Sequence, residues 1–89
     1  MGYSLASAYY LGMIQKKNGQ LDEAKKSFQK VIDNATDNDN NSHEFTSNSY
    51  FQMAGILEEE KKYKEAENSY RSAMHHVNKI ALKKDNLDY

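Results

Sequence analysis

The chain has 89 residues and a formal net charge of −1, from 12 Lys and Arg against 13 Asp and Glu. This balance gives no general electrostatic attraction to nucleic acid or an anionic membrane, so a partner must be recognised by shape and local pattern. Cysteine is absent, which excludes disulfides, thiolate metal sites and cysteine nucleophiles. Proline is also absent and glycine occurs 4 times, which favours helix along almost the whole chain. We therefore expect one small all-α domain.

The first predicted helix covers residues 5–15 and should end at Asn18 and Gly19, because glycine adopts the positive φ at which helices end. Residues 1–17 lack a basic leader and their apolar run is short, so we expect neither a signal peptide nor a membrane span. The three-and-four spacing of a helix places Leu5, Ala8, Leu11, Gly12 and Gln15 on one face, and Ala6, Tyr9 and Met13 on a second stripe.

The second predicted helix begins at Leu21, with Asp22 and Glu23 in its first turn, where carboxylates oppose the positive end of the helix dipole. The connection to the first helix is so short that the two must be antiparallel. Residues 33–42, DNATDNDNNS, predict a polar loop, because Asn and Asp side chains compete with the helix for the backbone. The expected buried face of this helix is Ala24, Phe28, Val31 and Ile32.

A third helix is expected to start near Thr46 or Ser47, and a fourth to run from about Lys64 nearly to Lys84, with a turn at residues 58–62 between them. About four helices are therefore predicted. The third places Tyr50, Met53, Ala54 and Leu57 inward, with Phe51 and Gly55 on a second stripe. The fourth has Ala66, Tyr70, Ala73, Met74, Val77, Ile80 and Ala81 on helical spacing.

An internal repeat organises the chain. NGQLDEAKKSFQKV at residues 18–31 is matched by EKKYKEAENSYRSA at 60–73, so that Ala24 and Ala66, like Phe28 and Tyr70, lie 42 residues apart. We interpret the chain, 1–89, as a single repeat domain of two units, 5–46 and 47–88. Each unit leaves an apolar flank for a neighbour, and at least three are normally needed for stability. We therefore expect either a fragment of a longer array or a chain that self-associates.

This pattern resembles the tetratricopeptide repeat, in which small residues let two antiparallel helices approach closely and aromatic residues fill the holes between them. The departures are Ala8 and Gln15 in place of the first unit's expected aromatics, and no proline closing either unit. The 42-residue offset exceeds the usual ~34 and is similar to the longer repeats of kinesin light chains and of bacterial peptide-sensing regulators of the Rap and NprR kind. The matching positions are Leu11, Gly12, Gly19, Ala24 and Phe28, then Tyr50, Ala54, Tyr63, Ala66, Tyr70 and Ala73.

The resemblance implies an α-solenoid of helix-turn-helix repeats that acts as a scaffold or adaptor for protein binding. Its first helices line a concave surface that suits an extended peptide or an amphipathic helix of a partner. An alternative is that the same side chains only pack on neighbouring helices. Two further alternatives are a self-association segment forming a homo-oligomer and part of a peptide-sensing regulator. The positions matching the concave surface are Tyr9, Met13, Lys16, Asn48, Phe51, Gln52 and Gly55.

The family's carboxylate clamp is not expected. It needs Lys, Asn and Arg where Tyr9, Met13 and Gln52 stand, and Asn48 alone cannot form it.

Residues that could carry chemistry are sparse. His75 and His76 differ by about 100° of helical rotation and cannot both face one metal, and His43 is expected in the loop. The acidic run at 58–60 is followed by two lysines and predicts a solvated turn. No nucleophile constellation or phosphate loop occurs. We expect no catalysis, metal or cofactor, no nucleic-acid or membrane partner, and a cytoplasmic location.

Overall fold

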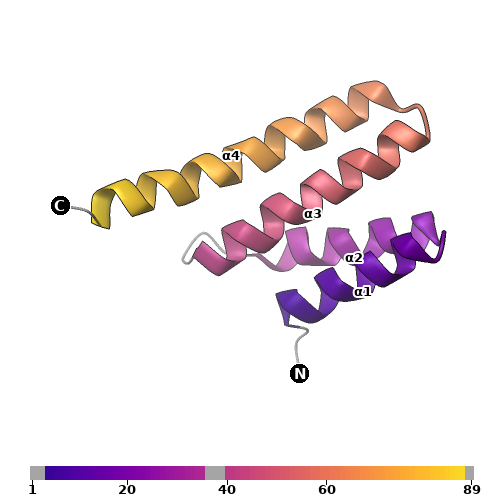
Figure 1. Cartoon of the computed structure of the whole chain (residues 1–89), viewed down its shortest axis with the longest axis horizontal. Coiled ribbons are helices and arrows are strands. Elements are labelled where there is room, and N and C mark those ends of the chain that lie inside the picture. The colour runs from indigo at the N-terminus through magenta and orange to yellow at the C-terminus, as the bar shows by residue number, and fades with distance from the viewer. Residues whose placement is uncertain (1–3, 36–39, 88–89) are drawn as a thin grey trace.

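The computed structural model describes residues 4–35 and 40–87, with side chains described for 4–35 and 42–80. Within these ranges the chain forms four α-helices and no strand, which confirms the all-α prediction. The helices are α1 (Leu5–Lys17), α2 (Leu21–Asn34), α3 (Asn40–Glu59) and α4 (Tyr63–Leu87). Each packs on the next, and α1 also contacts α3. The result is a flat molecule of 45 × 34 × 18 Å made of two antiparallel helix pairs (Figure 1).

The turns that join the helices of each pair have the same geometry. Gly19 has φ of 80°, and Lys61, which stands 42 residues later, has φ of 63°. After the first turn the Gln20 N–H donates to the Gln15 carbonyl at 2.9 Å, and after the second the Lys62 N–H donates to the Leu57 carbonyl at 2.8 Å. In both turns the bond closes a ring of six residues around a residue of left-handed conformation, which is a common way for a helix to end. The repeat found in the sequence is therefore also a repeat of backbone conformation.

The prediction that the third helix starts near Thr46 was wrong, because α3 begins at Asn40. The polar loop predicted at 33–42 was too long, since α2 reaches Asn34; residues 36–39 lie outside the described residues. The Asn and Asp side chains compete with the helix for backbone hydrogen bonds, but tertiary packing outweighs this effect, because Ser42, His43 and Thr46 are buried. The early turns of α3 lie beside the middle of α4, where His43 contacts His76, and α4 continues past them to Leu87 (Figure 1).

The core lies where the two pairs meet. Ala24, Phe28 and Ile56 form a fully buried cluster. A Cβ added to Gly12 would lie 2.8 Å from Cε1 of Phe28, so the backbone of α1 approaches that ring directly. Partly buried side chains surround the cluster, namely Tyr9, Met13, Leu21 and Met53. The repeat-pattern residues Ala24, Ala54, Ala66 and Ala73 are all buried, as expected for small residues at close helix crossings.

Three repeat-pattern residues are more exposed than expected. Leu11 is 46% exposed, because Gly12 faces α2 and a neighbouring residue is rotated by about 100° on the helix. Tyr63 is 64% exposed beside the turn, and Tyr70 is 36% exposed and donates its hydroxyl to Glu58. Ile56 takes a central core position that the sequence pattern did not single out.

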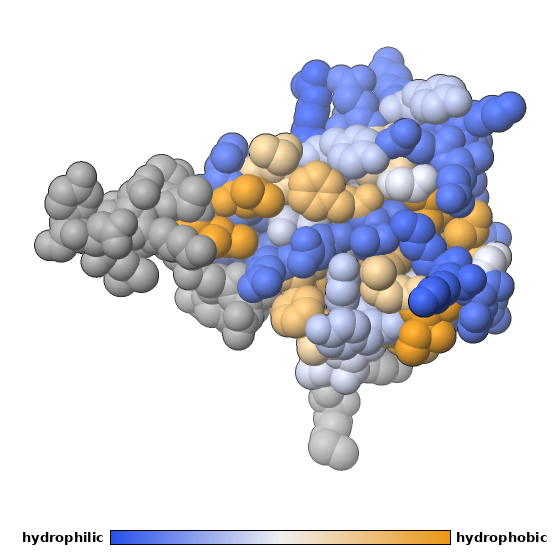
Figure 2. All heavy atoms as spheres, viewed as in Figure 1, coloured by the Kyte–Doolittle hydropathy of each residue, from blue (hydrophilic) through white to orange (hydrophobic). Residues whose placement is uncertain are grey.

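The described surface is mixed in polarity. On the face shown in Figure 2, apolar residues form separate patches with hydrophilic side chains between them. Among the described residues, no helix combines the length and the apolar character that crossing a bilayer requires.

Candidate functional site

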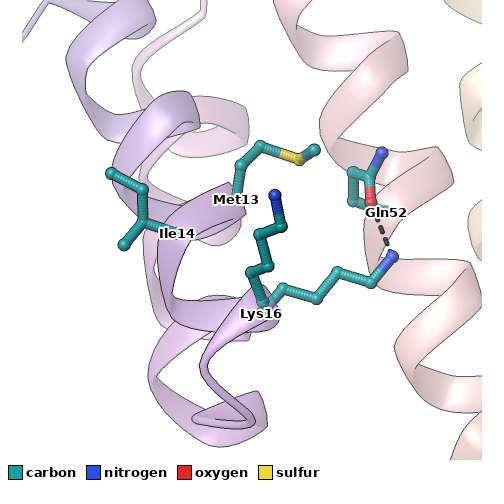
Figure 3. A pocket seen from close by; sticks show the side chains of 5 residues that line it. Met13, Ile14, Lys16 and Gln52 are labelled. Atoms are coloured by element: carbon teal, nitrogen blue, oxygen red, sulfur yellow. Dashed lines mark hydrogen bonds between the residues drawn. The ribbon is translucent and has the colours of Figure 1, made fainter.

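A groove of about 500 Å³ lies between α1 and α3. It is open to solvent, and its lining is mostly apolar, with polar groups supplied by two lysines and one amide. A volume of this size is typical of ligand pockets. The lining residues are Met13, Ile14, Lys16, Lys17 and Gln52 (Figure 3).

Helical periodicity places the groove-facing side chains of α1 on one face of that helix. Tyr9, Met13 and Lys16 follow one another at four and three residues, so they lie on one face of α1. Figure 3 shows Met13 and Lys16 directed toward α3, and Ile14 directed away from it. Ile14 is 58% exposed and therefore forms an apolar rim.

Lys16 and Gln52 join the two walls. The Nζ of Lys16 donates to Oε1 of Gln52 at 2.7 Å, in a partly buried contact between α1 and α3. A methyl group added at Gly55 would lie 3.6 Å from the same Nζ, so Gly55 faces the lysine and leaves room beside it. The polar end of the groove is thus a lysine held by a neutral amide.

Tyr9 connects the groove to the core. Its ring centroid lies 5.7 Å from that of Phe28 and 5.8 Å from that of Phe45. Burial raises the pKa of the Tyr9 hydroxyl; a hydrogen bond with Gln52 opposes this, and Tyr10 adds to it. The hydroxyl is therefore protonated at neutral pH. Oε1 of Gln52 accepts from Lys16, which fixes the orientation of the amide.

The structure brings together Tyr9, Met13, Lys16, Gln52 and Gly55 from the seven residues predicted to bind a partner. Tyr9 and Met13 also pack against the buried cluster, so the packing role considered as an alternative applies to both.

Phe51 and Asn48 complete the seven. The Phe51 ring lies apart from the groove lining, 6.1 Å from that of Tyr70 on α4. Asn48 is half-buried one turn before Gln52. Partner binding by these residues stays a prediction.

The sequence reasoning missed Ile14 and Lys17. Ile14 lay on neither expected stripe, although an aliphatic residue next to the predicted binding residue Met13 was a usable signal.

His43 was wrongly placed in a loop. It lies in α3 and is 1% exposed, and its Nδ1 is 2.8 Å from Nδ1 of His76 in α4. One ring nitrogen donates and the other accepts. Among the described residues, no group of three or more His, Asp or Glu side chains is placed to hold a metal ion.

Comparison with protein families gives one result. The tetratricopeptide repeat family model matches residues 4–75, which include α1, α2, α3 and the first half of α4. Comparison with curated proteins and with solved structures gave no significant match. The match covers most of the chain and agrees with the repeated turns and buried alanines described above. The chain therefore belongs to the tetratricopeptide repeat family.

Proposed function

We propose that this chain is a protein-interaction module whose groove between α1 and α3 holds a segment of a partner protein. Membership of the tetratricopeptide repeat family indicates a protein–protein interaction module. The observation that carries the finer proposal is the open, mostly apolar groove between the first helices of the two units. A polar pair, Lys16 and Gln52, lies at its end.

The groove chemistry suits a peptide or helix laid across the two helices. Met13 offers a flexible, polarisable surface that adapts to different apolar side chains. Ile14 extends this surface to the rim. Lys16 and Gln52 supply a donor and an acceptor that fix the orientation of the bound segment.

A non-catalytic role is part of the proposal. The groove is lined by two ammonium groups, one amide and two apolar side chains, with no acid–base pair or nucleophile among them. We propose no cofactor, nucleic acid or membrane as a partner, and a cytoplasmic location.

The test uses a pair of exposed apolar residues on α1. Ile14 lines the groove, and Leu11 does not, although both are about half exposed. Peptides selected from a random phage-displayed library on the immobilised chain should bind wild type and Leu11→Ser equally, and should bind Ile14→Ser much more weakly. Circular dichroism should show equal helix content in the two variants. Failure to enrich any peptide, or equal binding to Ile14→Ser, would contradict the proposal.

A second candidate function is self-association, and the exposed apolar residues at both ends of the molecule favour it. Tyr10, Leu11 and Ile14 are exposed on α1, and Tyr70 and Met74 on α4. These helices lie at opposite edges of the molecule (Figure 1), so α4 of one copy could pack on α1 of the next in a head-to-tail array. Sedimentation should then show larger species as concentration rises, and fewer of them for Tyr10→Ser with Met74→Ser. A monomer at every concentration would contradict this candidate.

The resemblances to kinesin light chains and to regulators of the Rap and NprR kind are also proposals. Sensing of a short free peptide, as in the Rap and NprR kind of regulator, would require the groove to bind that peptide without the rest of a partner protein. The division into units 5–46 and 47–88 stays a prediction, and its boundary lies within α3.

A further inference from the structure

The charge of the groove walls indicates which partner they suit. We propose that the bound segment carries an Asp or Glu side chain beside its apolar residues, and that this carboxylate replaces Gln52 as the acceptor for Lys16. The inference rests on the proposed function, because it concerns the occupant of the same groove.

Near the groove, the charged side chains of α1 and of the middle of α3 are lysines only; the acidic residues of α3, Glu44, Glu58 and Glu59, lie outside residues 46–57. The 13 residues of α1 include Lys16 and Lys17 and no acidic residue. Residues 46–57 of α3 include no charged side chain. The whole chain has a net charge of −1, so this excess is local to the groove. A local field of this kind attracts and orients a segment of the opposite charge.

Several other cations among the described residues are paired with carboxylates. Lys25 lies 2.8 Å from Glu60, and Arg71 lies 2.7 Å from Glu67. Within the part of the chain that the structure describes, neither Lys16 nor Lys17 makes an ion pair. Lys16 is bound to a neutral amide instead, at 2.7 Å. The bond to the amide is already charge-assisted at its donor, and a carboxylate acceptor adds the attraction between opposite charges.

The dipole of α1 accounts for part of this positive charge. Lys16 and Lys17 occupy the last turn, where the helix end carries roughly half a negative charge. The two positive charges of these lysines exceed the partial negative charge of the helix end. Lys16 is also ordered by Gln52 before binding, which lowers the side-chain entropy that a partner carboxylate must overcome.

A single side-chain carboxylate fits better than a denser anion. Two lysines beside the apolar surface of Met13 and Ile14 provide too few cations for a nucleic-acid backbone, and none of the described residues that line the groove has an aromatic ring for base stacking. The apolar surface needs apolar neighbours in the ligand. The occupant is therefore an internal protein segment in which an acidic residue adjoins apolar ones.

The experiment selects peptides from a random library displayed as fusions, whose carboxyl ends are blocked, on the full immobilised chain. Enriched sequences should contain Asp or Glu beside apolar residues. The leading synthetic peptide should bind Lys16→Met about tenfold more weakly than wild type, because methionine keeps the aliphatic stem and removes the charge. Replacing the acidic residue of the peptide by its amide should have a similar effect. Binding should also weaken as salt concentration rises.

Control variants separate the possible results. Lys26→Met removes an exposed lysine of α2 and should leave binding unchanged. Lys17→Met removes the second groove lysine at an exposed position, independent of the contact with Gln52, and should also weaken binding. Enrichment of neutral or basic peptides that still lose binding to Ile14→Ser would overturn the charge inference alone. Peptides that bind Ile14→Ser as well as wild type would overturn the proposed function together with it.

Discussion

Replacing Gly12 by alanine should destabilise the fold, although alanine is the better helix former. Gly12 is buried in the middle of α1, and its added Cβ would lie 2.8 Å from Cε1 and 3.0 Å from Cδ1 of Phe28. Real Cβ atoms do not approach a neighbour so closely, so the ring or the helix must move. Phe28 is 0% exposed and belongs to the central cluster, which leaves its rigid ring little space.

The expected magnitude is a difference between two opposing effects. Glycine to alanine inside a helix stabilises by roughly 0.5–1 kcal/mol. Overpacking a tight core costs about 1–3 kcal/mol. The overpacking term is the larger, and the free energy of unfolding should fall by about 0.5–2 kcal/mol.

Gly55 provides the matched control on α3. A Cβ added there meets only Nζ of Lys16, at 3.6 Å, which is an ordinary contact with a flexible side chain. Gly55→Ala should therefore show the helix preference alone and raise the free energy of unfolding by about 0.5–1 kcal/mol.

The assay is urea unfolding followed by circular dichroism, with the two variants and wild type measured together. The double variant Gly12→Ala with Phe28→Leu should be less unstable than the two single effects added, because the smaller side chain relieves the clash. If both alanine variants are stabilised by the same amount, Gly12 is not at a close helix crossing and the packing argument fails.

Three further predictions concern single side chains. Lys61→Gly should raise the free energy of unfolding by about 0.5–1 kcal/mol, because Lys61 holds a positive φ that glycine adopts without strain; a lower melting temperature would contradict this. Ser49→Ala and Thr46→Val should each stabilise the fold by about 1 kcal/mol in urea unfolding, since both hydroxyls are buried without a hydrogen-bond partner, and a loss of stability would show that they are satisfied. The hydrogen bond to Glu60 raises the pKa of Lys25 above 10.5, so this contact stabilises the folded state below that pH and is lost as pH rises through the folded-state value. Wild type should accordingly exceed Lys25→Met in stability at neutral pH and converge with it in alkali, and a difference that persists in alkali would count against the ion pair.

Local rules explain why the repeat could be predicted from sequence. Gly19 marks the first turn because few other residues adopt its φ, and the second turn, predicted at residues 58–62, contains Lys61 with its positive φ. Ala24 and Ala66 sit at crossings where a methyl group is all that fits, so their spacing survives in the sequence. The two turns depend on nearby residues only.

Features that depend on long-range packing could not be predicted. Asn and Asp near the start of α3 favour a loop locally, yet Ser42, His43 and Thr46 are buried and hold the helix to Asn40. The contact of His43 with His76 depends on how far α3 and α4 extend beside each other, which no short-range pattern specifies.

The residues of the candidate groove were predicted in part. The resemblance to the tetratricopeptide repeat family predicted Met13, Lys16 and Gln52, because it indicated which helices form the concave surface. Ile14 and Lys17 required the actual rotation of α1. The position of Phe51 against Tyr70 required the crossing of α3 and α4.

The most direct test of the account is a two-dimensional amide NMR titration of the full chain with a peptide selected on it. Shift changes should concentrate in the last two turns of α1 and around Gln52 of α3, and they should be much smaller in Ile14→Ser. Changes that concentrate on the exposed face of α4, around Met74, or that are the same in Ile14→Ser, would contradict a binding groove between α1 and α3.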